Sequence, residues 1–197
     1  SSVIGTQPVS ASEVSCRLTG ETPRTLTVQE IKDVVESFAE AARRAKEAGF
    51  DAAEIHGAHG YLINQFLSPL TNKRTDQYGG DVKGRTRFLL EILERIREKV
   101  GIGYPVLCRI NGDDYIEGGI TLEEAKAIAK MLEAGGVDAL HISAGIYDSP
   151  APVTTAPMAL PRGNLVHLAA GIKEVVNIPV IAAGRINDPE LAEEILR

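Results

Sequence analysis

Two histidines and a tyrosine stand close together in this sequence, at His56, His59 and Tyr61. They follow residues 52–55, a short apolar run of the kind that ends a buried β-strand. Imidazole N–H groups can bind an oxygen that gains negative charge. A phenol is protonated at neutral pH and can deliver its proton to a carbanion as it forms. The trio therefore suits a C=C bond conjugated to a carbonyl, with His56 and His59 binding the oxygen and Tyr61 acting as the acid.

Other roles stay open for the same residues. His56 could serve structure through hydrogen bonds, and Tyr61 could pack under the next loop with its hydroxyl bonded to backbone. Glu54 and His56 share one face of a regular strand, and His-x-x-His spacing occurs in zinc sites. A metal-dependent hydrolase is thus a second hypothesis. Because no complete ligand set with recognised spacing is evident, we expect no metal.

The predicted strands and helices that position these residues alternate along the chain, as they do in parallel β/α proteins. Capping boxes at Thr27/Glu30 and Thr121/Glu124 mark two helix starts, and Asp188 followed by a proline marks another. Strands are expected at residues 52–56, 106–110, 139–143 and 179–183. Helices are expected from 27 to 49, 85 to 100, 121 to 133 and 165 to 176, and after 188. Residues 57–80 are expected to form a long loop over the site.

An internal repeat indicates the size of the whole fold. The junctions EAGFDAAEIHGA, from residue 47, and EAGGVDALHISAG, from residue 133, resemble each other and lie two units apart. Each unit takes about 43 residues, so eight would need roughly 350. We therefore expect a partial (β/α)8 TIM barrel: residues 1–197 as a fragment of one domain, with 1–26 a lead-in loop and 27–197 about four β/α units. A small doubly wound sheet is the alternative, but a Gly-x-Gly-x-x-Gly turn is missing.

Reactive residues in such a barrel lie at the carboxyl ends of the strands, and two further candidates occur there. Arg109 ends the second expected strand and needs an anionic or electron-rich partner, or else a salt bridge to Asp113, Asp114 or Glu54. Gly184 and Arg185 end the fourth. The glycine permits close backbone approach and the arginine can pair with a phosphate, although a surface arginine fits as well. His141 and His167 lack such sequence neighbours and are expected to pack ordinarily.

Composition narrows the class of protein. A net charge of −6 without a basic cluster argues against nucleic-acid binding and fits a small-molecule enzyme. Neither a membrane span nor a signal peptide is evident, so no membrane partner is expected. Two cysteines are too few for a disulfide framework, and a reducing cytoplasm is the default location. Cys108 is expected to be a packed core residue.

Together these residues resemble the old yellow enzyme family of flavin-dependent ene-reductases. The motifs that carry the resemblance are HGAHGYL from residue 56, FLSPLTNKRTDQYGG from 66, CRI from 108 and IPVIAAGRINDP from 178. The match spans nearly the whole chain. The opening CRLTGETPRTLTVQEI, with YDSP and PRG later, is most similar to the branch of 2-enoate reductases and 2,4-dienoyl-CoA reductases.

The resemblance implies FMN across the barrel mouth, reduced by NADH or NADPH, and hydride transfer to the β-carbon of an enoate or enoyl substrate. It implies that His56 and His59 bind the carbonyl oxygen and that Tyr61 protonates the α-carbon. Arg109 would lie against the flavin, and Gly184 and Arg185 would help to hold its phosphate. In the dienoyl-CoA branch a histidine after the sixth strand assists protonation, whereas this chain has Tyr147 and Asp148 nearby. Participation of Tyr147 in protonation is one alternative, and the expected role is a wall of the substrate pocket.

The resemblance also implies features outside this chain. The family's remaining strands supply further FMN contacts, so flavin binding by residues 1–197 alone is doubtful. Larger members of the branch carry an iron-sulfur cluster and an FAD domain, which would lie in parts not present here. Related barrels oxidise amines, so an amine dehydrogenase is an alternative function. A non-catalytic barrel remnant is another alternative.

Residues 150–163 are rich in proline, and we expect them to form a semi-rigid lid.

Overall fold

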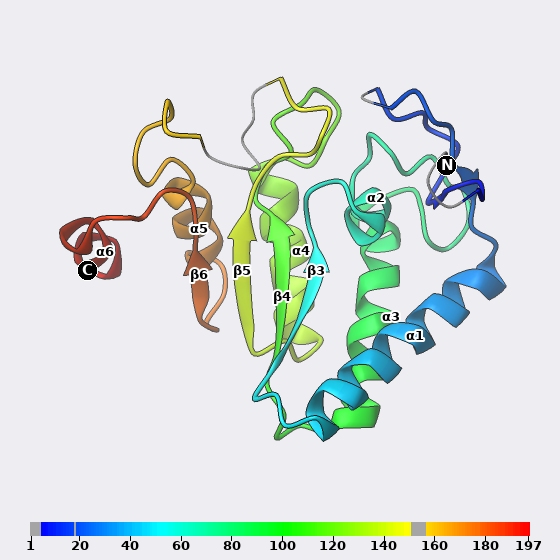
Figure 1. Ribbon diagram of the computed structural model, residues 1–197, viewed down its shortest axis with the longest axis horizontal. Coiled ribbons are helices and arrows are strands. Elements are labelled where there is room, and N and C mark those ends of the chain that lie inside the picture. The colour runs from blue at the N-terminus through cyan, green and yellow to red at the C-terminus, as the bar shows by residue number, and fades with distance from the viewer. Residues whose placement is uncertain (1–4, 18, 151–156) are drawn as a thin grey trace.

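The structure is a computed structural model that describes residues 5–17, 19–150 and 157–197. Four parallel strands stand side by side with helices packed behind them (Figure 1). The elements in chain order are β1 (Val9–Ser10), β2 (Arg24–Thr25), α1 (Val28–Glu47), β3 (Ala53–Gly57), α2 (Leu62–Leu67), α3 (Val82–Val100), β4 (Val106–Asn111), α4 (Leu122–Ala134), β5 (Ala139–Ser143), α5 (Val166–Lys173), β6 (Val180–Ala182) and α6 (Pro189–Leu196).

The main sheet has the order β3-β4-β5-β6, with every neighbouring pair parallel. Helices α3, α4 and α5 follow one another across one of its faces, and α1 packs along α3. Sequential parallel strands joined by helices are the construction of a (β/α)8 barrel, here with half of its strands. The expectation of a partial barrel is confirmed.

The sheet has one face buried against the helices and an opposite face, here called the open face. Ile55, Cys108 and Leu140 are paired across β3, β4 and β5 and are almost fully buried against the helices. Burial also raises the pKa of the Cys108 thiol, which is the behaviour of a packed core cysteine. Because side chains alternate along a strand, the residues between these point to the opposite face. That face carries the row His56, Arg109 and His141, in register with one another.

Helix starts follow the capping residues in the sequence. The Thr27 side chain accepts from the backbone N–H of Glu30, whose carboxylate accepts from the Thr27 N–H in return, and this reciprocal pair begins α1. Thr121 caps α4, and Asp188 caps α6 through two backbone N–H groups. Two expected boundaries were wrong by three residues. Helix α3 begins at Val82 rather than Arg85, because the Asp81 side chain caps it, and α5 ends at Lys173 rather than Val176.

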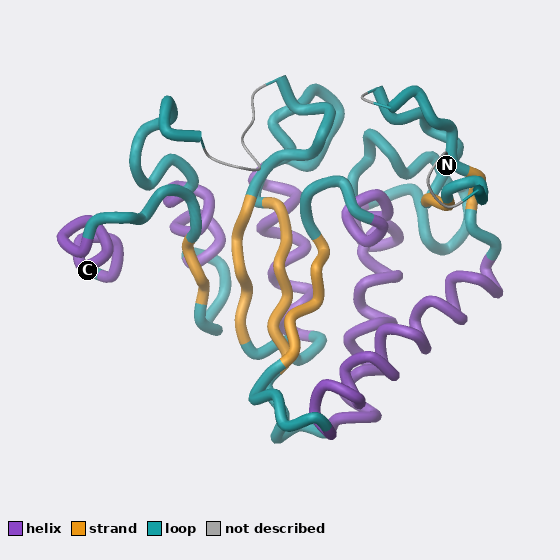
Figure 2. The backbone as a smooth tube through the Cα atoms, viewed as in Figure 1, coloured by secondary structure: helices purple, strands orange, loops and turns teal. Residues whose placement is uncertain are grey.

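The loop regions contain more structure than expected. Residues 57–80 include the short helix α2, and the lead-in segment, residues 5–26, includes the parallel pair β1 and β2 (Figure 2). Both were expected as loops. These elements are too short to show a hydrophobic period, and the contacts that hold them come from distant residues.

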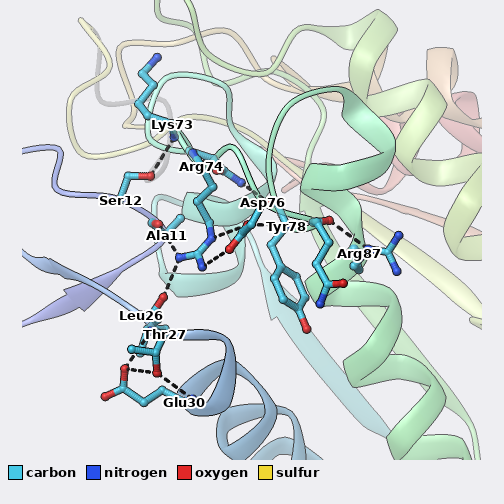
Figure 3. A network of polar contacts seen from close by, with 12 residues as sticks. Ala11, Ser12, Leu26, Thr27, Glu30, Lys73, Arg74, Asp76, Tyr78 and Arg87 are labelled. Carbon is cyan, nitrogen blue, oxygen red and sulfur yellow. Dashed lines mark hydrogen bonds and ion pairs between the residues drawn. The ribbon is translucent and has the colours of Figure 1, made fainter.

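Arg74 holds the lead-in segment against the rest of the molecule (Figure 3). Its guanidinium donates to the carbonyl oxygens of Ala11 and Leu26, at 3.1 and 2.7 Å, and pairs with Asp76. The neighbouring Lys73 backbone N–H donates to Ser12 Oγ at 2.8 Å. The motif around Arg74 therefore acts as a structural clamp.

Candidate active site

His56, His59 and Tyr61 meet where β3 ends. His56 lies on the open face of the sheet. The chain then turns through two left-handed residues, His59 (φ 62°) and Gly60 (φ 77°), and reaches Tyr61, the N-cap residue of α2. The Gly60 N–H donates to Asn64 Oδ1 at 2.8 Å. A left-handed conformation is uncommon for a histidine and requires support from its surroundings. The turn brings His59 and Tyr61 back over His56.

The rings of this trio are in contact. The His56 ring centroid lies 5.3 Å from that of His59 and 5.0 Å from that of Tyr61. The Tyr61 hydroxyl lies 2.6 Å from the Tyr147 hydroxyl, which comes from the loop after β5. The two phenols are hydrogen-bonded, and this contact raises the pKa of Tyr147. The structure thus brings together four of the residues singled out from the sequence.

Ser143 links His59 to Arg109. Its Oγ lies 2.6 Å from His59 Nε2 and accepts from Arg109 Nη2 at 3.0 Å. A guanidinium can only donate, and a hydroxyl oxygen has a second lone pair as well as its own hydrogen, so Ser143 can pair with His59 Nε2 in either tautomer of the imidazole.

Both site histidines are neutral at pH 7. Burial, with the positive charge of Arg109 as the second cause, lowers the pKa of His59 to about 4. The same two causes lower the pKa of His56. Neutral imidazoles can lie beside Arg109 without charge repulsion. Each offers one N–H donor, as binding of a carbonyl oxygen requires.

A buried polar network behind the turn was missed by the sequence analysis. Asn111, at the end of β4, accepts from the His59 backbone N–H at 3.3 Å and donates to Asp114 Oδ1 and the Gly145 carbonyl, at 2.8 and 3.0 Å. Asp114 is fully buried and also accepts from Ser68 Oγ and the Ile120 N–H. Its burial raises the pKa of the carboxyl. The network ties the ends of β3, β4 and β5 together, and polar residues at adjacent strand ends were its only sequence signal.

His141 corrects one expectation. Its position in a strand predicted ordinary packing, but it lies on the open face in register with Arg109, and its Nδ1 is 3.0 Å from Glu54 Oε2. Arg109 itself makes no salt bridge among the described residues, contrary to the alternative that paired it with a nearby carboxylate. No group of three metal-ligating side chains is assembled within residues 5–17, 19–150 and 157–197.

The remaining candidates lie at the end of β6. Gly184 has φ 106°, and a Cβ there would lie 3.0 Å from both Asn164 Oδ1 and Leu165 Cγ, so only glycine fits. Arg185 follows with φ 53°, and its Nη1 donates to the Met158 carbonyl at 2.8 Å. These contacts form a tight turn on the same edge of the sheet as the histidines. Whether a phosphate binds there stays a prediction.

The expectations for His167, for residues 150–163 and for membrane spans remain to be compared with the structure. His167 lies in α5, with Nε2 3.2 Å from the Tyr115 hydroxyl, away from the histidine pair. Of the expected lid at 150–163, residues 151–156 lie outside the described part of the chain. No helix within the described residues is long and apolar enough to cross a bilayer.

The fold and the site define a class of protein: a partial (β/α)8 barrel whose strands and carboxyl-end loops carry a phenol, paired imidazoles and an arginine. Comparison with known proteins then gives the family. The family model described as "NADH:flavin oxidoreductase / NADH oxidase family" matches residues 4–197. This chain belongs to that family.

Three curated relatives are similar over nearly the whole chain. An NADH oxidase of Thermoanaerobacter brockii is 54% identical over 98% of this chain, and a metal reductase of Desulforamulus reducens is 48% identical over 100%. An NADPH dehydrogenase of Clostridium acetobutylicum is 45% identical over 96%. The chain spans 29% of the length of the first two relatives and 54% of the third.

Solved structures confirm the resemblance to old yellow enzymes. A 2-naphthoyl-CoA reductase complex has a TM-score of 0.91 at 39% identity, covering 95% of this chain and 29% of that chain. Histamine dehydrogenase from Rhizobium sp. 4-9 has a TM-score of 0.87 at 32% identity, and the match covers 98% of this chain and 28% of that chain. An old yellow enzyme homologue from Zymomonas mobilis has a TM-score of 0.75 at 27% identity, and the match covers 98% of this chain and 54% of that chain.

Proposed function

We propose that this chain supplies the substrate-binding and proton-donating part of an NAD(P)H-dependent FMN ene-reductase. The reaction is reduction of the C=C bond of an α,β-unsaturated acid, thioester or ketone. The observation that carries the proposal is the contact of the His56 ring with both the His59 imidazole and the Tyr61 phenol at the mouth of the barrel, where the pKa values of both histidines are lowered. Hydrogen-bond donors stabilise the negative charge that develops on the carbonyl oxygen as an enone is reduced, and a protonated acid beside them can supply the proton.

Each residue has a role in this chemistry. His56 and His59 donate N–H groups to the carbonyl oxygen, which stabilises negative charge as the double bond accepts hydride. Ser143 holds the His59 ring in place through its contact with Nε2. Tyr61 gives its proton to the α-carbon, and Tyr147 orients the Tyr61 hydroxyl while forming a wall of the substrate site.

FMN fits the residues that are present. Arg109 Nε is buried and has no hydrogen-bond partner among the described residues, and it lies on the open face beside the histidines. A buried unpaired donor is costly, and an electron-rich ring edge would satisfy it. Gly184 and Arg185 would hold the phosphate. When bound, FMN supplies hydride received from NAD(P)H.

An amine dehydrogenase is the second candidate, because histamine dehydrogenase is similar to this chain along its length. Oxidation of an amine would use the same barrel mouth in the opposite redox direction. The site favours reduction because its neutral histidines and phenol are all hydrogen-bond donors. Family membership leaves the metal-dependent hydrolase without support.

The test uses the holoenzyme under anaerobic conditions. After reduction with NADH or NADPH, it is mixed with a panel of enoates, enones and enoyl thioesters while flavin absorbance is followed. We expect rapid reoxidation by at least one alkene, with the saturated product formed in equal amount. Bleaching of the oxidised holoenzyme by amines, with no reoxidation by any alkene, would reject the proposal in favour of amine oxidation.

A cytoplasmic location and the absence of nucleic-acid and membrane partners stay predictions. The same holds for the iron-sulfur cluster and FAD, which would be bound by residues outside this chain.

A further inference from the structure

Asp114 is a fully buried carboxylate, in the loop after β4, that the proposed chemistry does not use. Each of its carboxylate oxygens faces a group that can only donate. Oδ1 accepts from Asn111 Nδ2 at 2.8 Å, and Oδ2 accepts from the Ile120 N–H at 2.9 Å. Oδ2 also accepts from Ser68 Oγ at 2.8 Å. Donors on both oxygens fix the carboxylate in one orientation.

A first set of contacts runs from the Asp114 side chain to the turn before Tyr61. The Asn111 amide can adopt only one orientation, because its nitrogen faces the Gly145 carbonyl oxygen at 3.0 Å and its oxygen faces the His59 N–H at 3.3 Å. The left-handed conformation of His59 is strained and needs such support. The Asp114 carboxylate therefore supports this turn through Asn111.

A second set of contacts runs from the Asp114 backbone to the loop that carries Tyr147. The Ser149 hydroxyl donates to the Asp114 carbonyl oxygen at 2.6 Å and accepts from the Ile146 N–H at 2.8 Å. The Ile146 carbonyl oxygen in turn accepts from the Ser149 N–H at 3.1 Å. These bonds close the chain on both sides of Tyr147 into a turn that is attached to Asp114.

The two turns lie in direct contact. Gly60 packs so closely against Ile146 that an added Cβ would lie 3.3 Å from the Ile146 Cβ. The hydroxyls of Tyr61 and Tyr147 are 2.6 Å apart, although the two tyrosines are 86 residues apart in the sequence. Reacting groups have to be held to within about 0.5 Å, and a support shared by both turns provides this precision.

We propose that Asp114 is a positioning residue for the proton transfer. Its side chain holds the turn before Tyr61, and its backbone carbonyl, through Ser149, holds the loop that carries Tyr147. The inference rests on the proposed function, which makes Tyr61 the proton donor and Tyr147 the residue that orients it. Asp114 itself is fully buried and touches neither substrate nor cofactor.

The first test removes the second set of contacts with Ser149→Ala, which leaves the carboxylate untouched. In the anaerobic holoenzyme we expect reoxidation of the reduced flavin by an enone to slow about three- to tenfold, the value of one hydrogen bond. Flavin reduction by NAD(P)H should not change. Because Ser149 acts through Tyr147, adding Ser149→Ala to Tyr147→Phe should cause no further loss.

The control is Ser37→Ala, at an exposed position of α1, which should leave both half-reactions unaltered. Unchanged reoxidation in Ser149→Ala, equal losses in its two half-reactions, or a further loss in the double variant would overturn the proposal.

The second test replaces the carboxylate with an amide of the same size. In Asp114→Asn the new NH₂ group must face either Asn111 Nδ2 or the Ile120 N–H, which are both donors. This variant disturbs the turn at His59 as well, so we expect a lower kcat and a higher KM for the enone. Ser149→Ala should lower kcat alone. The result for Ser149→Ala decides the proposal if Asp114→Asn does not fold.

A third measurement does not depend on activity. The contact with Tyr61 raises the pKa of Tyr147, which can be followed in the holoenzyme by ¹³C NMR of tyrosine labelled at Cζ and assigned with Tyr147→Phe. Ser149→Ala and Asp114→Asn should both lower this pKa towards the usual value of about 10. A titration that neither variant changes would overturn the proposal. If no alkene reoxidises the wild-type enzyme, the ene-reductase function fails, while the titration still decides whether Asp114 holds the two phenols together.

Discussion

Ser143 joins His59 to Arg109, although it takes no part in the proposed chemistry itself. Its hydroxyl lies between an obligate donor, Arg109, and His59 Nε2. The sequence placed Arg109 and both histidines at strand ends correctly, since the carboxyl ends of parallel strands meet. It could not give the contact of His141 with Glu54, because that contact depends on the register between strands distant in sequence.

At the residue scale, the first prediction concerns the protonation of His59. Its pKa is lowered to about 4 in the folded protein, against about 6.5 in an unfolded chain. The folded state therefore binds fewer protons, and the stability that this shift contributes is present above pH 6.5 and lost as pH falls towards 4. NMR of ¹⁵N-labelled histidine, assigned with His59→Gln, should show His59 neutral at pH 6. A midpoint near 6.5 would contradict the described environment.

At the scale of elements, Asn111 joins three strand ends to the turn that carries the histidine. Asn111→Ala removes the donor to two buried acceptors, Asp114 Oδ1 and the Gly145 carbonyl. We expect the free energy of unfolding to fall by about 2–4 kcal/mol, measured by chemical denaturation. Asn177→Ala, at an exposed position, is the control and should change it by less than about 0.5 kcal/mol. Equal effects would show that the network does not hold the turn.

The elements also show where sequence patterns succeed and fail. The helix starts at Thr27, Thr121 and Asp188 were predicted because a capping side chain acts on backbone within its own first turn. Helix α2 and the β1–β2 pair were missed. Their stability comes from long-range contacts such as that of Arg74 with Ala11, 63 residues away in the chain, and no local pattern reports those.

At the scale of the whole molecule, the open face of the sheet is half of a barrel interior. His56 and Ile181 on this face are exposed, so the four strands alone do not enclose a ligand. We expect residues 1–197 alone to bind FMN at least about tenfold more weakly than the same chain joined to the other strands of the barrel. Titration of FMN fluorescence measures both affinities. Equal values would show that these four strands contain the whole flavin site.

The central claim is that Tyr61 is the proton donor of an ene-reductase, and stopped-flow measurement of the two half-reactions of Tyr61→Phe tests it most directly. Loss of the phenol should slow reoxidation of the flavin by an enoate about 100-fold or more, the usual contribution of a general acid, and leave flavin reduction by NAD(P)H nearly unchanged. The matched control is Tyr104→Phe, which removes a buried hydroxyl that has no partner among the described residues. It should leave both rates unaltered. Equal losses in the two half-reactions of Tyr61→Phe, or no loss in either, would contradict the assignment.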